Sequence, residues 1–238
     1  MKHEIFWRVE KYGEVGSTND IAHKRALSGE REGLVVVADS QTKGRGRLNR
    51  TWFSPVGRNV YLSILLKPDE EAVGVIPFVC GLAATDAFKK FGLETKLKWP
   101  NDVVAGDKKI GGILCEYKGE GFVIAGVGMN LNVPASEFPD DIKDSATSYL
   151  IETKKVLDRK EFIESFLTFF KLWYIKPHSE VVKEAKRRCI TLKRRVKALL
   201  LAREIEGVAC DMDSKGALLI QTDTGLVRIE TGDIVHLR

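Results

Sequence analysis

The sequence predicts an α+β protein in two domains, and three observations support that prediction. Apolar segments of strand-like composition alternate with amphipathic helical segments as far as about residue 190. From about residue 192, short strands follow one another at the spacing of a small β-barrel. The 238 residues, 44% of them hydrophobic, are enough to bury a core. We therefore expect a first domain over residues 1–191 and a second over residues 192–238.

The N-terminal part of the chain is expected to contain two helices and two strands. Residues 17–19, Ser-Thr-Asn, precede "DIAHKRAL", and their side-chain oxygens are expected to accept hydrogen bonds from the first-turn amides of a helix. Gly29 suits the end of that helix. "GLVVVAD" (33–39) and "NVYLSILL" (59–66) are rich in β-branched and aliphatic residues, which predicts strands. Apolar residues recur at helical spacing over 75–92.

Strands dominate the centre of the chain. "TKLKW" (95–99) alternates in polarity, and Pro100 is expected to end it. "KIGGILCEYK" (109–118) and "FVIAGVGMNLNV" (122–133) are joined by the glycine-rich turn "GEG". These two segments are therefore expected to form a hairpin.

Two further helices precede the C-terminal strands. Asp158 and Glu161 resemble a capping box at the start of the first, and its aromatic residues share one broad face that we expect to be core. "SEVVKEAKRRC" (179–189) predicts the second. The aromatic residues are Phe162, Phe166, Phe169, Phe170 and Trp173. The strands expected beyond them are 196–201, 206–213, 216–223, 226–230 and 233–238.

Composition argues against several classes of protein. The net charge of +5 is modest, so any affinity for anions must come from local clusters of basic residues. The four cysteines and four histidines are widely spaced and form no metal-ligand or protease motif, which disfavours zinc and disulfide sites. The N-terminus lacks a signal-peptide core, and no stretch approaches 18 uninterrupted apolar residues. We expect a cytoplasmic protein that does not enter a membrane.

The glycine-rich basic segment "KGRGRLNR" (43–50) is the first candidate for binding chemistry. Its glycines allow backbone amides to approach a ligand, and its arginines can donate two hydrogen bonds to a phosphate or a carboxylate. It matches neither the Walker pattern nor G-x-G-x-x-G. By itself the segment is compatible with an anion site, an exposed basic loop or a nucleic-acid arm.

Three other segments have both a functional and a structural interpretation. "KWPND" (98–102) places a lysine before a turn, or is simply the end of a strand. In "GDKKIGGILCE" (106–116), Lys109 lies next to two glycines and is expected either to bind an anion or to be a surface lysine beside a bulge. "GVGMNLN" (126–132) needs either a flat ligand or a tight packing contact against its glycines. The basic residues of 186–195 suit a nucleic-acid site, but we expect a solvated helix end and hinge because no aromatic residues accompany them.

Five motifs in this order resemble biotin–protein ligases, which attach biotin to a lysine of a carrier protein. They are "STN" (17–19), "QTKGRGR" (41–47), "KWPND", "KKIGGIL" (108–114) and "GVGMNLN", and the resemblance extends from about residue 12 to the C-terminus. It implies a mixed sheet flanked by helices, similar to class II aminoacyl-tRNA synthetases, followed by an SH3-like β-barrel. It also implies two steps. Biotin and Mg-ATP form biotinyl-5′-AMP, and a lysine of a biotin carboxyl carrier protein or biotinyl domain then takes the biotin.

The resemblance implies roles for individual residues. Lys109 is expected to bridge the biotin carboxylate and the α-phosphate, with Arg47 and Lys98 as further catalytic residues. Mg²⁺ accompanies ATP, and its protein ligands stay unassigned. The residues expected at biotin are Ser17, Thr18, Asn19, Gln41, Gly44, Arg45, Gly46, Arg47, Trp52, Lys109, Gly112, Leu114, Gly126 and Gly128. The residues expected at ATP are Arg45, Arg47, Arg50, Lys98, Asn101, Asp102, Lys109, Asn130 and Arg238.

The chain departs from the usual family loop, G-R-G-R-R-G-R. Leu48 and Asn49 replace Arg and Gly, but Asn can still adopt the left-handed conformation that glycine would supply, so a similar turn stays possible. Lys43 replaces a commonly small residue and is expected to add charge near the phosphates. No helix-turn-helix precedes "WRVEKYG", so we expect a monofunctional ligase that does not bind DNA.

Relatives of this kind often dimerise, and 59–66 as an edge strand would support a homodimer. Two alternatives to biotin ligation stay open. One is a ligase or transferase of lipoate or octanoate on the same fold. The other is a basic module that contains an SH3-like domain, binds nucleic acid and does no chemistry.

Overall fold

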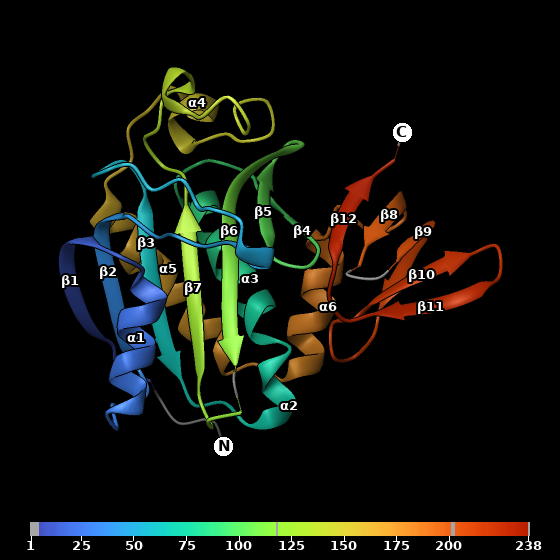
Figure 1. Cartoon of the computed structure of the whole chain (residues 1–238), viewed down its shortest axis with the longest axis horizontal. Coiled ribbons are helices and arrows are strands. Elements are labelled where there is room, and N and C mark those ends of the chain that lie inside the picture. The colour runs from blue at the N-terminus through green and yellow to red at the C-terminus, as the bar shows by residue number, and fades with distance from the viewer. Residues whose placement is uncertain (1–4, 118, 201–202, 238) are drawn as a thin grey trace.

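The computed structural model describes residues 5–117, 119–200 and 203–237, apart from the side chain of Asn49. Figure 1 shows a large sheet flanked by helices, with a second sheet to one side. The large sheet has seven strands in the order β1-β2-β3-β7-β6-β5-β4. Only its β1–β2 pair is parallel among the pairings of these residues, so the sheet is mixed, as expected. The strands are β1 (Arg8–Val15), β2 (Leu34–Gln41), β3 (Val60–Leu66), β4 (Lys96–Lys98), β5 (Asp102–Ala105), β6 (Lys108–Tyr117) and β7 (Val123–Met129).

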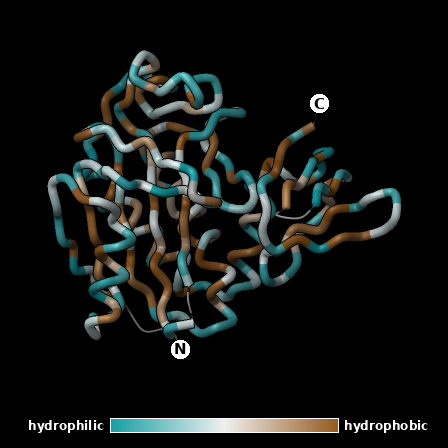
Figure 2. The backbone as a smooth tube through the Cα atoms, viewed as in Figure 1, coloured by the Kyte–Doolittle hydropathy of each residue, from teal (hydrophilic) through white to brown (hydrophobic). Residues whose placement is uncertain are grey.

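Helices cover both faces of this sheet. The helix α1 (Thr18–Leu27) packs on one face through Ala22 and Ala26, which meet Leu34 and Val36 of β2. The long helices α3 (Ile76–Lys90), α5 (Arg159–Tyr174) and α6 (His178–Arg188) lie on the other face, where the larger core forms. Figure 2 shows the central strands as predominantly hydrophobic. Two short helices, α2 (Glu70–Val73) and α4 (Tyr149–Thr153), join these elements.

The predicted capping and aromatic face of α5 are confirmed. The Asp158 side chain accepts a hydrogen bond from the Glu161 amide at 2.9 Å. Phe162, Phe166 and Phe170 are fully buried, while the remaining two aromatic residues of the stripe are partly buried against the same core. The stripe is therefore core, because helical spacing directs it at α3 and the sheet.

Three expectations about strands were incomplete or wrong. The strands β1 and β5 were not predicted, since β1 is rich in charged residues and β5 has only four residues. Asp102 was expected in a turn, but it begins β5. The segment 59–66 forms β3 in the middle of the sheet, between β2 and β7, and all seven residues of β3 are buried. A homodimer cannot use β3 as an exposed edge, because β1 and β4 are the edges.

The five strands expected near the C-terminus form an antiparallel sheet in the order β11-β10-β9-β8-β12. This sheet contacts the first region through Trp99, whose indole nitrogen donates to the Gly216 carbonyl at 2.9 Å. The boundary at residue 192 stays a prediction. No helix in the described ranges combines the length and apolar character needed to span a membrane. The strands are β8 (Arg195–Leu199), β9 (Glu204–Met212), β10 (Leu218–Thr222), β11 (Gly225–Ile229) and β12 (Asp233–His236).

Candidate active site

A cavity of about 430 Å³ opens between the large sheet and the C-terminal strands. Its floor comes from β6 and β7, and its rim from the segment 45–53, the β4–β5 hairpin and β12. The structure brings nearly all the predicted site residues to this one place. The predicted residues that line it are Ser17, Thr18, Asn19, Gln41, Arg45, Gly46, Arg47, Arg50, Trp52, Lys98, Asn101, Asp102, Lys109, Gly112, Leu114, Gly126, Gly128 and Asn130.

Strand register explains why glycines are needed on the cavity floor. Gly126 of β7 pairs with Ser63 of β3 on one side and with Leu114 of β6 on the other. Asn19 from α1 lies over Gly126, and a Cβ at that glycine would stand 2.3 Å from the Asn19 side-chain oxygen. The missing side chain therefore lets Asn19 span the sheet from β6 to β3.

An aromatic ring packs against the next pair of residues on the cavity floor. Gly112 and Gly128 are register partners, and a Cβ at either would come within 3 Å of the Trp52 indole. The Trp52 indole thus packs against Gly128 of "GVGMNLN". Gly126 and Gly128 also line the cavity, so the packing contact and the binding of a ligand are compatible at this strand.

A chain of buried polar groups occupies the end of the cavity beside α1. The Ser63 hydroxyl contacts the Thr18 hydroxyl at 2.7 Å and donates to the Asn19 side-chain oxygen at 2.5 Å. The Asn19 amide nitrogen donates to the Glu116 carboxylate at 2.6 Å. Thr18, Asn19 and Ser63 are all less than 5% exposed. Buried polar groups with this many partners form a rigid hydrogen-bonding surface.

The start of α1 differs from the expected side-chain cap. Ser17 occupies the N-cap position, but within the described part of the chain its side chain makes no capping hydrogen bond. Instead the Gln41 side-chain oxygen, from the end of β2, accepts from the Thr18 amide at 2.9 Å and contacts its hydroxyl at 3.1 Å. A remote side chain thereby ties the helix start to the sheet.

Lys109 lies at the opposite end of the cavity. Its ammonium group is 2.7 Å from an Asp102 carboxylate oxygen and 5.3 Å from the centre of a Trp52 ring. The β5–β6 pairing shifts register beside it, so the bulge interpretation is correct, and the lysine lines the cavity as well. Its amide donates to the Ser145 carbonyl at 2.8 Å, which fixes its backbone. Asn101 donates to the Ile113 carbonyl at 2.6 Å and so anchors the hairpin.

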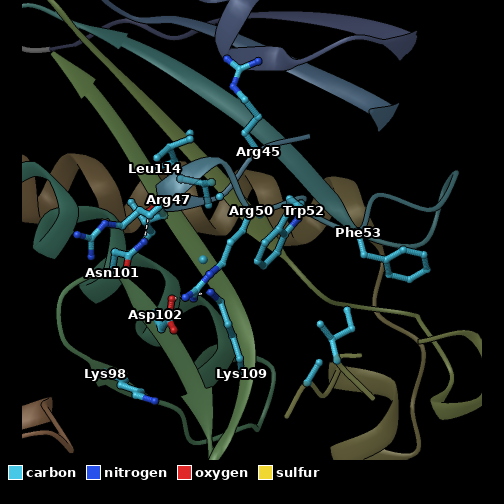
Figure 3. A pocket seen from close by; sticks show the side chains of 18 of the residues that line it. Arg45, Arg47, Arg50, Trp52, Phe53, Lys98, Asn101, Asp102, Lys109 and Leu114 are labelled. Atoms are coloured by element: carbon cyan, nitrogen blue, oxygen red, sulfur yellow. Dashed lines mark hydrogen bonds and ion pairs between the residues drawn. The ribbon is translucent and has the colours of Figure 1, made fainter. Parts of the chain in front are cut away.

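The arginines of the segment 45–50 are each held by the protein. Arg45 donates to both carboxylate oxygens of Asp20, at 3.0 and 2.5 Å, and this hydrogen bonding raises the pKa of Arg45. Arg50 forms an ion pair with Asp233 of β12. Figure 3 shows Arg50 close to Asp102 and Lys109, whereas Arg45 is directed away from them.

Arg47 is held by the turn that leads into β12. Its guanidinium donates to the Gly232 carbonyl at 3.1 Å and to the Thr231 hydroxyl. Burial lowers its pKa from the usual value, although a guanidinium keeps its charge at any physiological pH. The residue that follows Arg47, Leu48, is left-handed, with φ of 53°.

This geometry can be compared with that of known proteins. Residues 13–132 match the biotin/lipoate A/B protein ligase family, and residues 191–237 match the biotin protein ligase C-terminal domain. A bifunctional ligase/repressor of Bacillus subtilis is 32% identical over 98% of this chain and 76% of its own length.

The chain belongs to the biotin/lipoate A/B protein ligase family. A biotin–[acetyl-CoA-carboxylase] ligase of Mycobacterium tuberculosis is 31% identical over 98% of this chain and 90% of the relative. The structure of a biotin protein ligase of Aquifex aeolicus in complex with biotin and ATP superposes with a TM-score of 0.85 at 33% identity, covering 98% of this chain and all of that one.

Two of the residues predicted for a biotin ligase are not placed in the cavity. Gly44 lies beside it, packed against Ser54 and Trp52, where a Cβ would come within 2.8 Å of both. Arg238 lies outside the described residues. Lys43, expected to add charge at the phosphates, is exposed and is not among the lining residues.

Other lining residues of this ligase fold escaped the sequence analysis. Ser63 does not line the cavity itself but contacts Thr18 and Asn19, and it was a detectable signal because it is a polar residue inside the apolar strand "NVYLSILL". Asp233 and its neighbours in β12 carried no signal, since their place at the rim depends on how the two sheets meet. The unpredicted lining residues include Thr51, Phe53, Leu62, Val104, Asp107, Phe138, Ile142, Leu199 and Ile234.

Proposed function

We propose that this chain is an ATP-dependent biotin–protein ligase that makes biotinyl-5′-AMP and transfers biotin to a lysine of a carrier protein. One observation carries the proposal. A single cavity has a rigid polar end at Thr18 and Asn19 and a cationic end at Lys109 and Arg50. Such a cavity suits a ligand with a hydrogen-bonding ring at one end and a carboxylate at the other.

The polar end suits the ureido ring of biotin. Thr18, Asn19 and Gln41 offer hydroxyl and amide groups at this end of the cavity. Leu114 and the Trp52 indole provide apolar surface between the two ends. The carboxylate of a biotin bound this way would point at the cations.

The cationic end suits the first step. A biotin carboxylate oxygen attacks the α-phosphorus of ATP, a bond from that phosphorus to the β-phosphate oxygen breaks, and pyrophosphate leaves. Lys109 and Lys98 both line this part of the cavity. Fixed cations offset the repulsion between the two anionic reactants and stabilise charge on the phosphoryl oxygens. In the second step a carrier lysine amine attacks the acyl carbon, loses a proton and displaces AMP.

Magnesium enters this proposal as part of the ATP complex. Asp102 and Asp233 line the cavity, but each forms an ion pair with a cation of the site. In residues 5–117, 119–200 and 203–237, no group of three His, Cys, Asp or Glu side chains is arranged to hold a metal ion. Mg²⁺ usually binds through substrate phosphates, water and one or two carboxylates, which these residues can supply after exchanging partners.

We further propose a cytoplasmic protein whose partner is a biotin carboxyl carrier protein or biotinyl domain, and whose basic residues 186–195 do not bind DNA. Most of these cations form ion pairs within the protein. Arg188 pairs with Asp86 at 2.5 Å and with Glu184 at 2.6 Å, and Lys186 lies 2.8 Å from Asp211. Cations already paired with carboxylates make a poor phosphate-binding surface. A homodimer stays a prediction.

Incubation of the protein with biotin, Mg-ATP and a biotinyl domain tests the proposal. The domain should gain one biotinyl group by mass spectrometry, and pyrophosphate should appear in step with it. Isothermal titration should show binding of biotin and no comparable binding of lipoate. Transfer of lipoate or octanoate instead would reject the proposed substrate, and salt-dependent binding of RNA or DNA without pyrophosphate release would reject ligation altogether.

A further inference from the structure

Glu116 does not line the cavity itself but contacts a residue that lines its polar end. It sits on β6 two residues after Leu114, so the two side chains share one face of the strand. Its carboxylate accepts from the Asn19 amide nitrogen at 2.6 Å, and the Leu114 carbonyl accepts from the same nitrogen at 3.3 Å. Both protons of the Asn19 amide are therefore committed to β6.

These acceptors determine which way the Asn19 amide points. With its nitrogen toward Glu116, its oxygen faces Ser63, which donates at 2.5 Å. A hydroxyl has one proton, so the Ser63 oxygen is an acceptor toward Thr18, whose hydroxyl lies 2.7 Å away. The Thr18 proton is thus drawn toward Ser63 and is shared with Gln41 at 3.1 Å. The Glu116 carboxylate, at one end of this hydrogen-bond chain, therefore determines which group donates and which accepts in each bond.

We propose that Glu116 is a positioning residue for biotin, acting through Asn19 and Ser63. By fixing the direction of this hydrogen-bond chain, it leaves lone pairs of the Thr18 oxygen to accept a ureido N–H in the cavity. The inference rests on the proposed function, since it concerns how that site recognises its ring. A carboxylate only accepts hydrogen bonds, so it sets the direction where an amide or hydroxyl would allow either.

The hydrogen-bond chain depends on the position of Asn19 over Gly126. Ser63, Gly126 and Leu114 form one row across β3, β7 and β6, and Asn19 bridges the outer two because the middle position has no side chain. Glu116 reaches the Asn19 nitrogen from the β6 side. The glycine and the carboxylate are thus two parts of one arrangement.

Three variants test the inference in the full-length protein. Glu116→Ala removes the acceptor and should raise the dissociation constant for biotin about tenfold, because hydrogen bonds to charged groups are among the stronger ones. Glu116→Gln keeps an acceptor oxygen but lets the hydrogen-bond chain run in either direction, so it should recover only part of that loss. Glu120→Ala is the matched control, since Glu120 forms an exposed ion pair with His23 at 3.0 Å and should leave biotin binding unchanged.

The readouts distinguish positioning from a general loss of structure. Glu116→Ala should raise KM for biotin while leaving KM for ATP and kcat at saturating biotin near wild-type values. Adding Ser63→Ala to Glu116→Ala should cost little beyond the single change, because both break the same chain.

Two results would overturn the inference while biotin ligation itself stands. One is wild-type biotin affinity in Glu116→Ala, and the other is an equal loss of biotin and ATP binding in that variant. If the wild-type protein fails to bind biotin or to release pyrophosphate, the proposed function fails first, and this inference fails with it.

Discussion

The two ends of the cavity are organised in opposite ways. At the polar end, Thr18, Asn19 and Ser63 are buried, and their hydrogen bonds run between α1 and the sheet. At the cationic end, Lys109 and Arg50 are partly exposed and each is paired with a carboxylate of the protein. One end is complete before a ligand arrives, and the other must exchange partners.

This difference has an energetic reason. A half-exposed ion pair contributes only about 0–1 kcal/mol, so a phosphate or carboxylate can take over its cation at small cost. A buried hydrogen-bond chain costs much more to rearrange, because any group left unpaired loses about 1–3 kcal/mol. We therefore expect the polar end to set ligand identity and the cationic end to respond to the ligand.

The strongest test of this contrast is Lys109→Ala. Loss of a fixed cation should lower the rate of adenylate formation by at least about 10²-fold while biotin affinity changes little, since the polar end is intact. Pyrophosphate release and biotin titration measure the two effects. Lys108→Ala is the matched control, because Lys108 is the exposed neighbour of Lys109. Wild-type pyrophosphate release by Lys109→Ala would reject the role assigned to this lysine.

The cavity floor gives the next largest effect. In Gly128→Ala the new Cβ would stand 2.5 Å from the Trp52 indole, so we expect a loss of about 1–3 kcal/mol in unfolding free energy. Biotin affinity should fall with it, because Trp52 must move. Gly13→Ala is the control, since nothing lies within 4 Å of its Cβ position. Denaturant melts of both variants with equal midpoints would contradict the proposed packing of Trp52.

The segment 45–50 should show its effect in retention of the intermediate. Arg47→Gly removes the guanidinium that is held by Thr231 and Gly232, so biotinyl-5′-AMP should leave about tenfold faster and label lysines of unrelated proteins. Lys43→Gly removes an exposed cation of the same segment and should retain the intermediate normally. An unchanged release rate in Arg47→Gly would show that the loop does not retain the adenylate.

The smallest expected effect concerns pH. Burial, and then the positive charge of Lys98 and Arg194, lower the pKa of His236 to about 4. The unfolded chain, with a histidine pKa of about 6.5, binds more protons between these two values. The contribution of neutral His236 to folding stability should be fully present above about pH 6.5. It should be lost progressively as the pH drops toward 4. In His236→Gln, the drop in Tm between pH 7 and 5 should shrink by about 2–4 °C, and an unchanged slope would contradict this origin.

Local patterns were enough to predict many elements. Helical spacing identified α3 and α5, and β-branched composition identified β2, β3 and β7. The strand β1 was missed because half of its residues are charged and it lies at an edge of the sheet, so its composition does not resemble that of a buried strand. The strand β5 was missed because four residues carry too little periodicity. Both are short or exposed segments that pairing with a neighbour stabilises.

Predictions for the site succeeded where a motif lies next to its own chemistry. Lys109 beside its glycines and the arginines of 45–50 could be picked out of the chain. The partners of the arginines could not, because Asp20 and Asp233 stand at distant positions with no pattern of their own. Glu116 and Ser63 meet Asn19 only through the register of three strands.

The sequence by itself determined the kinds of helices and strands, the family resemblance and the residue types available for binding. The tertiary structure decided which carboxylate holds each cation, why Gly126 must lack a side chain, and how Glu116 reaches the polar end. The physical reason is the distance along the chain over which each influence acts. Periodicity and propensity act within a few residues along the chain, whereas register and the approach of two sheets depend on residues far apart in it.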